Sequence, residues 1–494
     1  MLFAASLDSV SLPWLESLIA SNELPNLRAL TQRGTVVPVE AVRLAGLAYP
    51  SFYSGLSPAD VGIYFPYQWS PERQQVRDWH EFPAPPSLFQ RLDRAGVRTV
   101  VLDPPECRSE VLRNGVMISG WQFHSRILLH RWSTPAGELR NLAARFGAPE
   151  RADEVFGRPT PRVLLDMLRV LRKAPQRLLQ AAEHYLATSP DLLWVNCCAL
   201  HVAGHQFFDL GLLNRDEVSA TDWRQLESAL LDIAKAYDHV LGRIIERLPA
   251  GSTILVFYAK GMGPTADWAD LLPEMLRRIL GEPPVANSAA SARDLLPRGL
   301  REWIADAIPD RTALWITARL STPKADWPRT RAFPLISDGP GYIRFNLEGR
   351  EKLGCVPRST ASELFAQIEE GLRTFTDFDG EPCVAEVLRP IDLLGAGTKL
   401  DWYPDQLVFW KRKSTLHGKG VRSPRYGELR RRGVGTGRSG NHFQGAMAIA
   451  VEGRNRIQPI HRNLWPQDIP TTILSALGLP HADLPGHALL APTE

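Results

Sequence analysis

Four side chains of this sequence closely follow short apolar runs, and their types suit chemistry on an anion. Asp8 follows LFAAS, His201 and His205 follow DLLWVNC, and Lys260 follows STILVFY. The histidines are four residues apart, so a helix would place both imidazoles on one face, at the spacing of two metal ligands. The lysine offers a point charge for an anion or, once desolvated, a general base or a Schiff-base amine.

The elements that must position these residues alternate along the chain. Runs of strand length are bounded by turn residues, whereas stretches such as PSLFQRLDRAG and LESALLDIAKAYDHVLGRIIERL carry apolar residues at helical spacing. This alternation predicts an α/β fold with a central, mostly parallel sheet flanked by helices. Because such sheets bind ligands beyond the carboxyl ends of their strands, we expect the four side chains on one shared rim.

Two stretches, 124–190 and 265–330, interrupt the alternation with mainly helical signals. We interpret both as helical insertions into a single α/β domain that spans residues 1–494. They are expected to cap the strand ends and to shape the substrate pocket.

Composition excludes several classes of protein. The chain has 494 residues, 44% of them hydrophobic, which is enough for a sizeable core. The net charge of +3 gives no argument for binding to nucleic acid or to a membrane surface. Five cysteines lack the spacing of a zinc knuckle or a disulfide framework, so we expect a reducing, cytoplasmic compartment. The start, MLFAASLDSV, predicts neither a signal peptide nor a membrane span.

Nine motifs occur in order along nearly the whole chain. They are LDSVSLPWLESLIASNELPNLRALTQRG, YPSFYSGLSPADVGIY, HVAGHQFF, YDHVLGRIIERL, VFYAKGMGP, GYIRFNLEGREKLG, SPRYGEL, RSGNHFQGAMAIAVEG and IPTTILSALGLPHADLPGHALL. Their order and spacing resemble the alkaline phosphatase superfamily, in particular its type I phosphodiesterase and nucleotide pyrophosphatase-like branch. The resemblance implies an alkaline-phosphatase-like fold and a two-metal site that hydrolyses phosphate or sulfate esters.

The resemblance assigns three residues to the family's metal ligands. One metal of the family is held by an aspartate and a histidine four residues apart and by a late histidine. The other is held by an early aspartate, an aspartate-histidine pair and the nucleophilic threonine or serine. Asp8 matches the early aspartate, His205 the histidine of the four-residue spacing, and His442 in SGNH the late histidine.

The remaining positions depart from the family pattern. Ala259 and Lys260 replace the aspartate-histidine pair, so the second metal loses two ligands. The nucleophile position, counted back from Gly55, falls on Ala45, and an alignment on Ser51 would need a deletion that nothing else supports. The covalent route of the family is therefore not expected here.

The third departure replaces an aspartate by another metal ligand, His201. With His205 and His442 it can form a mononuclear site with an open position, which suits zinc and also iron, copper, nickel or cobalt. Three neutral ligands leave the charge of the ion uncompensated, which favours an anionic small-molecule substrate. The alternative is that no metal binds and the imidazoles form hydrogen bonds within a cleft.

The charged candidates also have two interpretations each. Lys260 can replace the second cation, pairing with Asp8 and holding a substrate anion, or it can form a structural ion pair without chemistry. Asp8 can be a general base only if Lys260 leaves it accessible. Arg438, in a basic stretch, can contact the substrate anion or lie in a solvated loop.

Three classes of function stay open after the sequence. The first is a one-metal hydrolase or phosphodiesterase that uses a metal-activated water. The second is a repurposed enzyme of specialised metabolism with non-hydrolytic chemistry, and the third is a non-catalytic ligand-binding pseudoenzyme. The sequence names no substrate and carries no signal for an oligomeric state.

Overall fold

The computed structural model describes residues 1–40, 43–44, 48–283 and 308–493. These residues form two compact units: the first comprises 1–61, 84–265 and 436–494, and the second 62–83 and 266–435. The division into one domain with two helical insertions stays a prediction. Ala45, the residue at the expected nucleophile position, lies outside the described residues.

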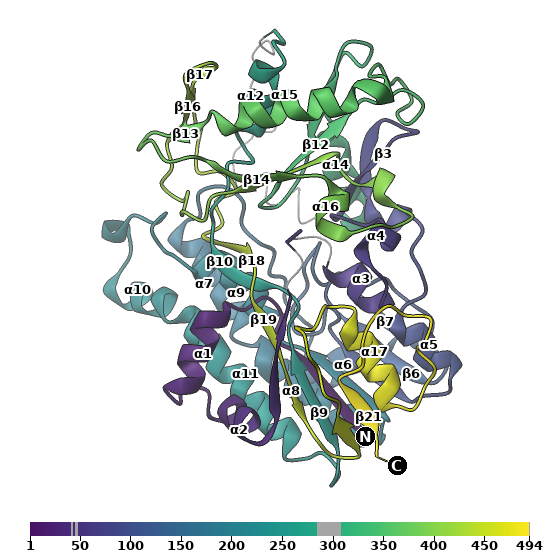
Figure 1. Ribbon diagram of the computed structural model, residues 1–494. Coiled ribbons are helices and arrows are strands. Elements are labelled where there is room, and N and C mark those ends of the chain that lie inside the picture. The colour runs from purple at the N-terminus through teal and green to yellow at the C-terminus, as the bar shows by residue number, and fades with distance from the viewer. Residues whose placement is uncertain (41–42, 45–47, 284–307, 494) are drawn as a thin grey trace. The chain divides into compact units, whose positions relative to one another are not determined.

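The first unit is built on an eight-stranded sheet of order β2-β19-β9-β1-β8-β5-β6-β7 (Figure 1). Its central strands β9, β1, β8, β5 and β6 run parallel, while β19 and the edge strand β7 run against them. The other edge strand, β2, is antiparallel to β19 and so runs in the direction of the central strands. The predicted α/β fold with a mostly parallel sheet is thus confirmed. The strands are β1 Leu2–Ser6, β2 Thr35–Val39, β5 Thr99–Leu102, β6 Gly115–Ser119, β7 Trp132–Thr134, β8 Leu192–Asn196, β9 Thr253–Phe257 and β19 Ala446–Val451.

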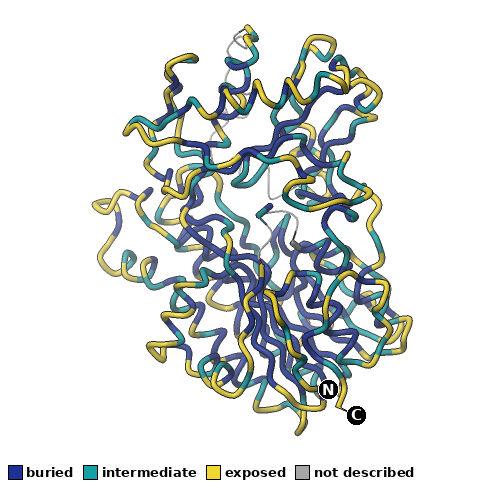
Figure 2. Tube along the Cα trace, in the orientation of Figure 1, coloured by how far each residue is buried: buried dark blue, intermediate teal, exposed yellow. Residues whose placement is uncertain are grey.

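Helices cover this sheet, and every residue of β1, β8 and β9 is buried (Figure 2). Helices α2 and α11 lie to the left of the sheet in Figure 1, and α5 and α17 to the right. The helices are α1 Leu12–Ala20, α2 Pro25–Arg33, α3 Ala48–Ser54, α4 Pro58–Val61, α5 Leu88–Arg94, α6 Glu138–Phe146, α7 Pro161–Leu171, α8 Ala174–Leu186, α9 Ala199–Phe207, α10 Ala220–Glu227, α11 Ala229–Ile245 and α17 Asp468–Ala476. The predicted stretch 124–190 therefore holds α6, α7 and α8, together with the edge strand β7.

Trp194 on β8 stands at the centre of the core of this unit. Its indole is fully buried and contacts the rings of Phe52, Phe89 and Phe257 at centroid distances of 5.6, 5.2 and 5.5 Å. Large buried rings of this kind contribute about 3–5 kcal/mol each to stability. Only two residues separate β8 from α9, so the packing of Trp194 also fixes where α9 begins.

The second unit contains a four-stranded antiparallel sheet of order β11-β12-β15-β14. Its buried Arg344 pairs with Glu351 at 2.8 Å, and the carboxylate also accepts from Nε1 of Trp69 at 2.7 Å, which compensates the charge. The elements are β3 Tyr67–Ser70, β4 Gln75–Asp78, α12 Leu272–Ile279, α14 Asp310–Leu320, β11 Ala332–Leu335, β12 Gly341–Phe345, α15 Ala361–Arg373, β13 Thr376–Asp377, β14 Val384–Leu388, α16 Pro390–Leu394, β15 Gln406–Trp410, β16 Gly420–Ser423 and β17 Gly427–Arg430.

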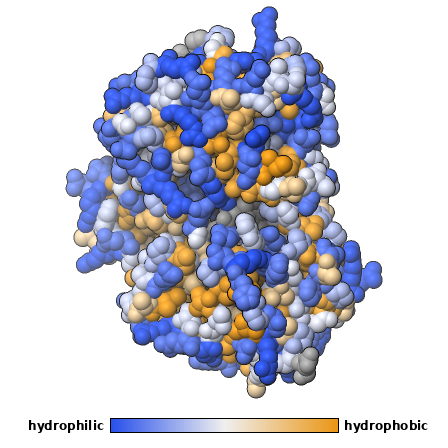
Figure 3. Space-filling view, in the orientation of Figure 1, coloured by the Kyte–Doolittle hydropathy of each residue, from blue (hydrophilic) through white to orange (hydrophobic). Residues whose placement is uncertain are grey.

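The surface is mixed in character. On the face shown in Figure 3, apolar side chains form several separate patches among hydrophilic ones. Among the described residues, no helix combines the length and the apolar character needed to cross a membrane.

Candidate functional site

Two elements of the first unit carry the three candidate histidines. His201 and His205 lie on α9, and His442 lies on β18 (Gly440–Phe443), which pairs with β10 (Gly261–Pro264) in antiparallel register. Gly440 allows β18 to approach α9, because a Cβ atom there would lie only 2.2 Å from the carbonyl oxygen of Gly204. The glycines thus bring a distant loop against the helix that bears the first two imidazoles.

The three imidazoles converge in the structure. Their ring centroids are 4.8 to 4.9 Å apart, and one candidate ligand atom from each lies within 4.8 Å of the other two. Nδ1 of His205 contacts the carbonyl oxygen of Gly440 at 2.8 Å, so this nitrogen donates and Nε2 carries the lone pair. That Nε2 atom, like Nδ1 of His442, is buried and has no hydrogen-bond partner within the described residues.

His201 completes the group with its orientation set by a carboxylate. Its Nδ1 lies 3.0 Å from Oδ2 of Asp8 and 3.3 Å from the hydroxyl of Ser9. Since the carboxylate accepts, Nδ1 donates, which leaves Nε2 as the nitrogen that can bind a metal ion. A carboxylate behind a histidine is the usual arrangement that fixes the tautomer of a metal ligand.

The electrostatics keep two of these rings neutral. Burial, together with the neighbouring Arg438 and His201, lowers the pKa of His205 to about 3. Burial and the ammonium of Lys260 hold the pKa of His442 well below its usual range. Both imidazoles are therefore unprotonated at neutral pH, which is the form that binds metal.

Asp8 is buried, and both of its carboxylate oxygens are engaged. Oδ1 accepts from Ser9 at 3.0 Å and from the hydroxyl of Tyr49, while Oδ2 accepts from His201. Burial acts to raise the pKa of Asp8, but His201, Lys260 and Tyr49 outweigh it and lower the pKa. The contacts of Asp8 support an orienting role, and its role as a general base stays a prediction.

Lys260 is buried beside Asp8 but pairs with a different carboxylate. Its Nζ lies 3.5 Å from Oε2 of Glu106 and 4.4 Å above the ring centroid of Tyr49. The expected ion pair with Asp8 is therefore wrong in its partner, because a turn after β5 brings Glu106 closer; the charge of Lys260 still lowers the pKa of Asp8. No motif in the sequence includes Glu106, and Tyr49 opens the motif YPSFYSGLSPADVGIY without any sign that it would contact Lys260 or Asp8.

Arg438 is buried rather than solvated, with a side chain 4% exposed. Its Nη1 donates to Oε2 of Glu154 at 2.9 Å, and Oε1 of that carboxylate is 3.9 Å from Nε2 of His201. Burial acts to raise the pKa of Glu154, but His205, Arg438 and His201 lower it to about 2. Glu154 lies in a loop between α6 and α7 without a recognisable motif, so sequence reasoning missed it.

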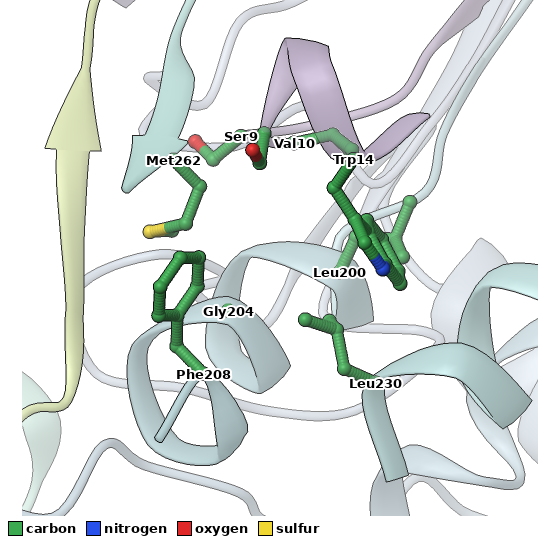
Figure 4. Close-up of a pocket in the computed structure, with 9 residues that line it drawn as sticks. Ser9, Val10, Trp14, Leu200, Gly204, Phe208, Leu230 and Met262 are labelled. Atoms are coloured by element: carbon green, nitrogen blue, oxygen red, sulfur yellow. The ribbon is translucent and has the colours of Figure 1, made fainter. Parts of the chain in front are cut away.

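A small apolar pocket lies along another side of α9 (Figure 4). Trp14, Phe208 and Met262 contribute its large side chains, and Leu200 and Leu230 line it further. Ser9 also lines this pocket, and its hydroxyl donates to Asp8. The residue that contacts both Asp8 and His201 is thus packed against an apolar wall.

A family model described as type I phosphodiesterase / nucleotide pyrophosphatase matches residues 5–381. The chain belongs to this family. The match includes Asp8, His201, His205 and Lys260, whereas Arg438 and His442 lie beyond it. No curated protein was found that matches the chain in sequence.

Solved structures extend the fold likeness over nearly the whole chain. A phosphonoacetate hydrolase from Sinorhizobium meliloti 1021, in complex with phosphonoformate, is 16% identical, with 95% of this chain and 94% of that chain covered and a TM-score of 0.51. The alkaline phosphatase PafA is 9% identical, and the likeness covers 99% of this chain and 98% of PafA at a TM-score of 0.53. Murine ectonucleotide pyrophosphatase / phosphodiesterase 5 is 10% identical, and the likeness covers 99% of this chain and 100% of the murine chain at a TM-score of 0.48. The first two likenesses give the fold of the alkaline phosphatase superfamily, as the motifs predicted.

Proposed function

We propose that this type I phosphodiesterase family member is a hydrolase-like enzyme that uses one metal ion to act on a small anionic substrate. The observation that carries the proposal is the convergence of three imidazoles in which two ring nitrogens, Nε2 of His205 and Nδ1 of His442, are buried without a hydrogen-bond partner among the described residues. Burying such nitrogens unpaired costs about 1–3 kcal/mol each, and a bound metal ion would remove that cost.

The donor set fits a divalent first-row metal. His201, His205 and His442 would hold the ion through three neutral nitrogens with a position left open, which suits zinc first and iron or another first-row metal second. When bound, such an ion supplies Lewis-acid chemistry, lowering the pKa of a water molecule and polarising a substrate oxygen.

The surrounding residues of the chain then have distinct roles. Asp8 holds Nδ1 of His201 and thereby aims Nε2 of that ring. Lys260 adds a buried positive charge near Asp8 and His442, which favours an anionic substrate. The solved relative that holds phosphonoformate supports a small phosphorus-containing anion as the first substrate class to test.

A second candidate, a ligand-binding pseudoenzyme or an enzyme with non-hydrolytic chemistry, is favoured by one observation. The oxygens of Asp8, which matches a ligand of the family's second metal, are engaged by Ser9, Tyr49 and His201. Together with the expected loss of the nucleophile at Ala45, these contacts argue against the covalent two-metal route. We also propose a cytoplasmic location, which the five unpaired cysteines support.

The proposal is tested with zinc-, manganese- and cobalt-loaded protein. The assay measures hydrolysis of p-nitrophenyl phosphate, bis(p-nitrophenyl) phosphate and a panel of small phosphate esters and phosphonates. We expect little turnover of the nitrophenyl esters, and metal-dependent turnover of a panel member that His442→Ala abolishes and Ser51→Ala leaves intact. Binding of inorganic phosphate without turnover of any panel member would favour the pseudoenzyme, and activity lost only in Ser51→Ala would show that the nucleophile was misaligned.

A further inference from the structure

The carboxylate of Glu154 lies between a histidine of the candidate metal site and a guanidinium. Oε1 is 3.9 Å from Nε2 of His201, and Oε2 accepts from Nη1 of Arg438 at 2.9 Å. The side chain is 17% exposed, so it is largely shielded from water. One oxygen thus faces the imidazoles while the other is held by a cation.

The loop that carries Glu154 is anchored to both elements that bear the histidines. The carbonyl oxygen of Val155 accepts from Nε2 of Gln206, the neighbour of His205 on α9, at 3.2 Å. The amide of Gly157 donates to the carbonyl oxygen of Thr436, shortly before β18, at 2.7 Å. The position of Glu154 is therefore fixed by the same framework that positions the imidazoles.

The distances suit a shared ion. Two ligands bound to one zinc ion at about 2.0–2.2 Å in tetrahedral geometry are roughly 3.3–3.6 Å from each other. Oε1 of Glu154 is 3.9 Å from Nε2 of His201, so a side-chain movement of about half an ångström reaches that separation. The candidate nitrogens of the three histidines lie within 4.8 Å of one another, so they must approach each other by a larger distance than Glu154 must move.

Charge favours the same arrangement. Three neutral imidazoles leave both positive charges of a divalent ion uncompensated in a buried site, which is costly unless an anion binds. An ionised carboxylate on the ion would remove half of that charge.

We propose that Glu154 is a fourth protein ligand of the metal ion, and that it exchanges between the ion and Arg438. Oε2 pairs with Arg438 in the structure, and the carboxylate would turn from the guanidinium to a bound ion. This inference rests on the proposed function, since it requires a metal ion at His201, His205 and His442.

The exchange predicts effects of opposite sign for its two partners. Glu154→Gln removes the anionic ligand, so we expect cobalt affinity to fall about 10- to 100-fold. Arg438→Met removes the competing cation, so affinity should rise, by about tenfold. A guanidinium that merely repels the ion would give the same rise in a Glu154→Gln background, whereas competition for the carboxylate gives a much smaller rise there.

The experiment is a cobalt titration of wild type, the two single variants and the double variant, followed by visible absorption. The spectrum reports ligand replacement, so it should change in Glu154→Gln even at saturating cobalt. Glu150→Gln is the matched control, because Glu150 lies in the same loop and pairs with Arg169 and Lys173 at the surface. This control should bind cobalt as wild type does.

The outcomes separate the two proposals. If wild type binds one cobalt ion and Glu154→Gln binds it equally well with an unchanged spectrum, the inference is overturned while the one-metal function stands. If Arg438→Met raises cobalt affinity equally in the wild-type and the Glu154→Gln backgrounds, the exchange is also overturned. If wild type binds no cobalt, the proposed one-metal function is refuted, and the inference that rests on it is refuted too. Thermal unfolding of each variant identifies any loss of affinity caused by misfolding.

Discussion

Replacing Lys260 by methionine tests whether its ammonium is held by Glu106. The substitution keeps most of the apolar stem and removes the charge. It leaves the carboxylate of Glu106, a residue 8% exposed, without the cation that lies 3.5 Å away. We therefore expect Lys260→Met to destabilise the protein through an uncompensated buried charge.

The magnitude follows from the distance and the burial. Two unit charges 3.5 Å apart attract each other by about 5 kcal/mol at an effective dielectric constant near 20, which is an upper bound on the net effect. Removing one member of a buried pair typically costs about 3–5 kcal/mol. Because Glu106 retains some solvent contact, we expect a loss of about 3 kcal/mol in the free energy of unfolding.

The assay is urea unfolding of wild type, Lys260→Met, Glu106→Gln and the double variant. The double variant removes both charges. Its loss in the free energy of unfolding should therefore be about 2 kcal/mol smaller than the sum of the losses in the two single variants. Lys235→Met is the matched control, since Lys235 forms a surface pair with Glu23 and should change stability by no more than about 1 kcal/mol. Single losses that add within about 0.5 kcal/mol would refute the coupling and favour a different partner for Lys260.

Two further predictions concern the histidines. The folded protein keeps His205 unprotonated down to about pH 3, whereas the unfolded chain protonates it below about pH 6.5, so its contribution to stability is present above pH 6.5 and is lost on acidification. Wild type should lose up to about 1.4 kcal/mol per pH unit more than His205→Gln between pH 6 and pH 4, and equal slopes in urea unfolding would contradict this. Gly440→Ala would place a Cβ atom 2.2 Å from the carbonyl oxygen of Gly204, pushing His442 away from α9. It should lower cobalt affinity at least tenfold, and unchanged affinity would show that the close approach is not needed.

The fold could be predicted because its signals are local. The runs that became β1, β8 and β9 are short and apolar, and a parallel sheet buries such strands on both faces. The spacing of His201 and His205 is likewise a property of one helix, α9, which holds both imidazoles. These features need only the neighbouring residues to be recognised.

The partners of the site could not be predicted in the same way. Glu106 and Glu154 lie in irregular loops, where no periodicity indicates which direction a side chain takes. Tyr49 is 41 positions from Asp8 in sequence, and nothing in the motif that contains it indicated that its hydroxyl donates to Asp8. Such contacts depend on how loops pack after the sheet has formed, so single-sequence reasoning found Lys260 but assigned it the wrong carboxylate.

The metal content of the protein tests the central claim most directly. Protein dialysed against zinc and then freed of loosely bound ions is measured by elemental analysis, beside His201→Ala, His205→Ala and His442→Ala. The account predicts one zinc ion per chain in wild type and a much lower content in each variant. No zinc in wild type, two ions per chain, or one ion that survives all three substitutions would contradict it.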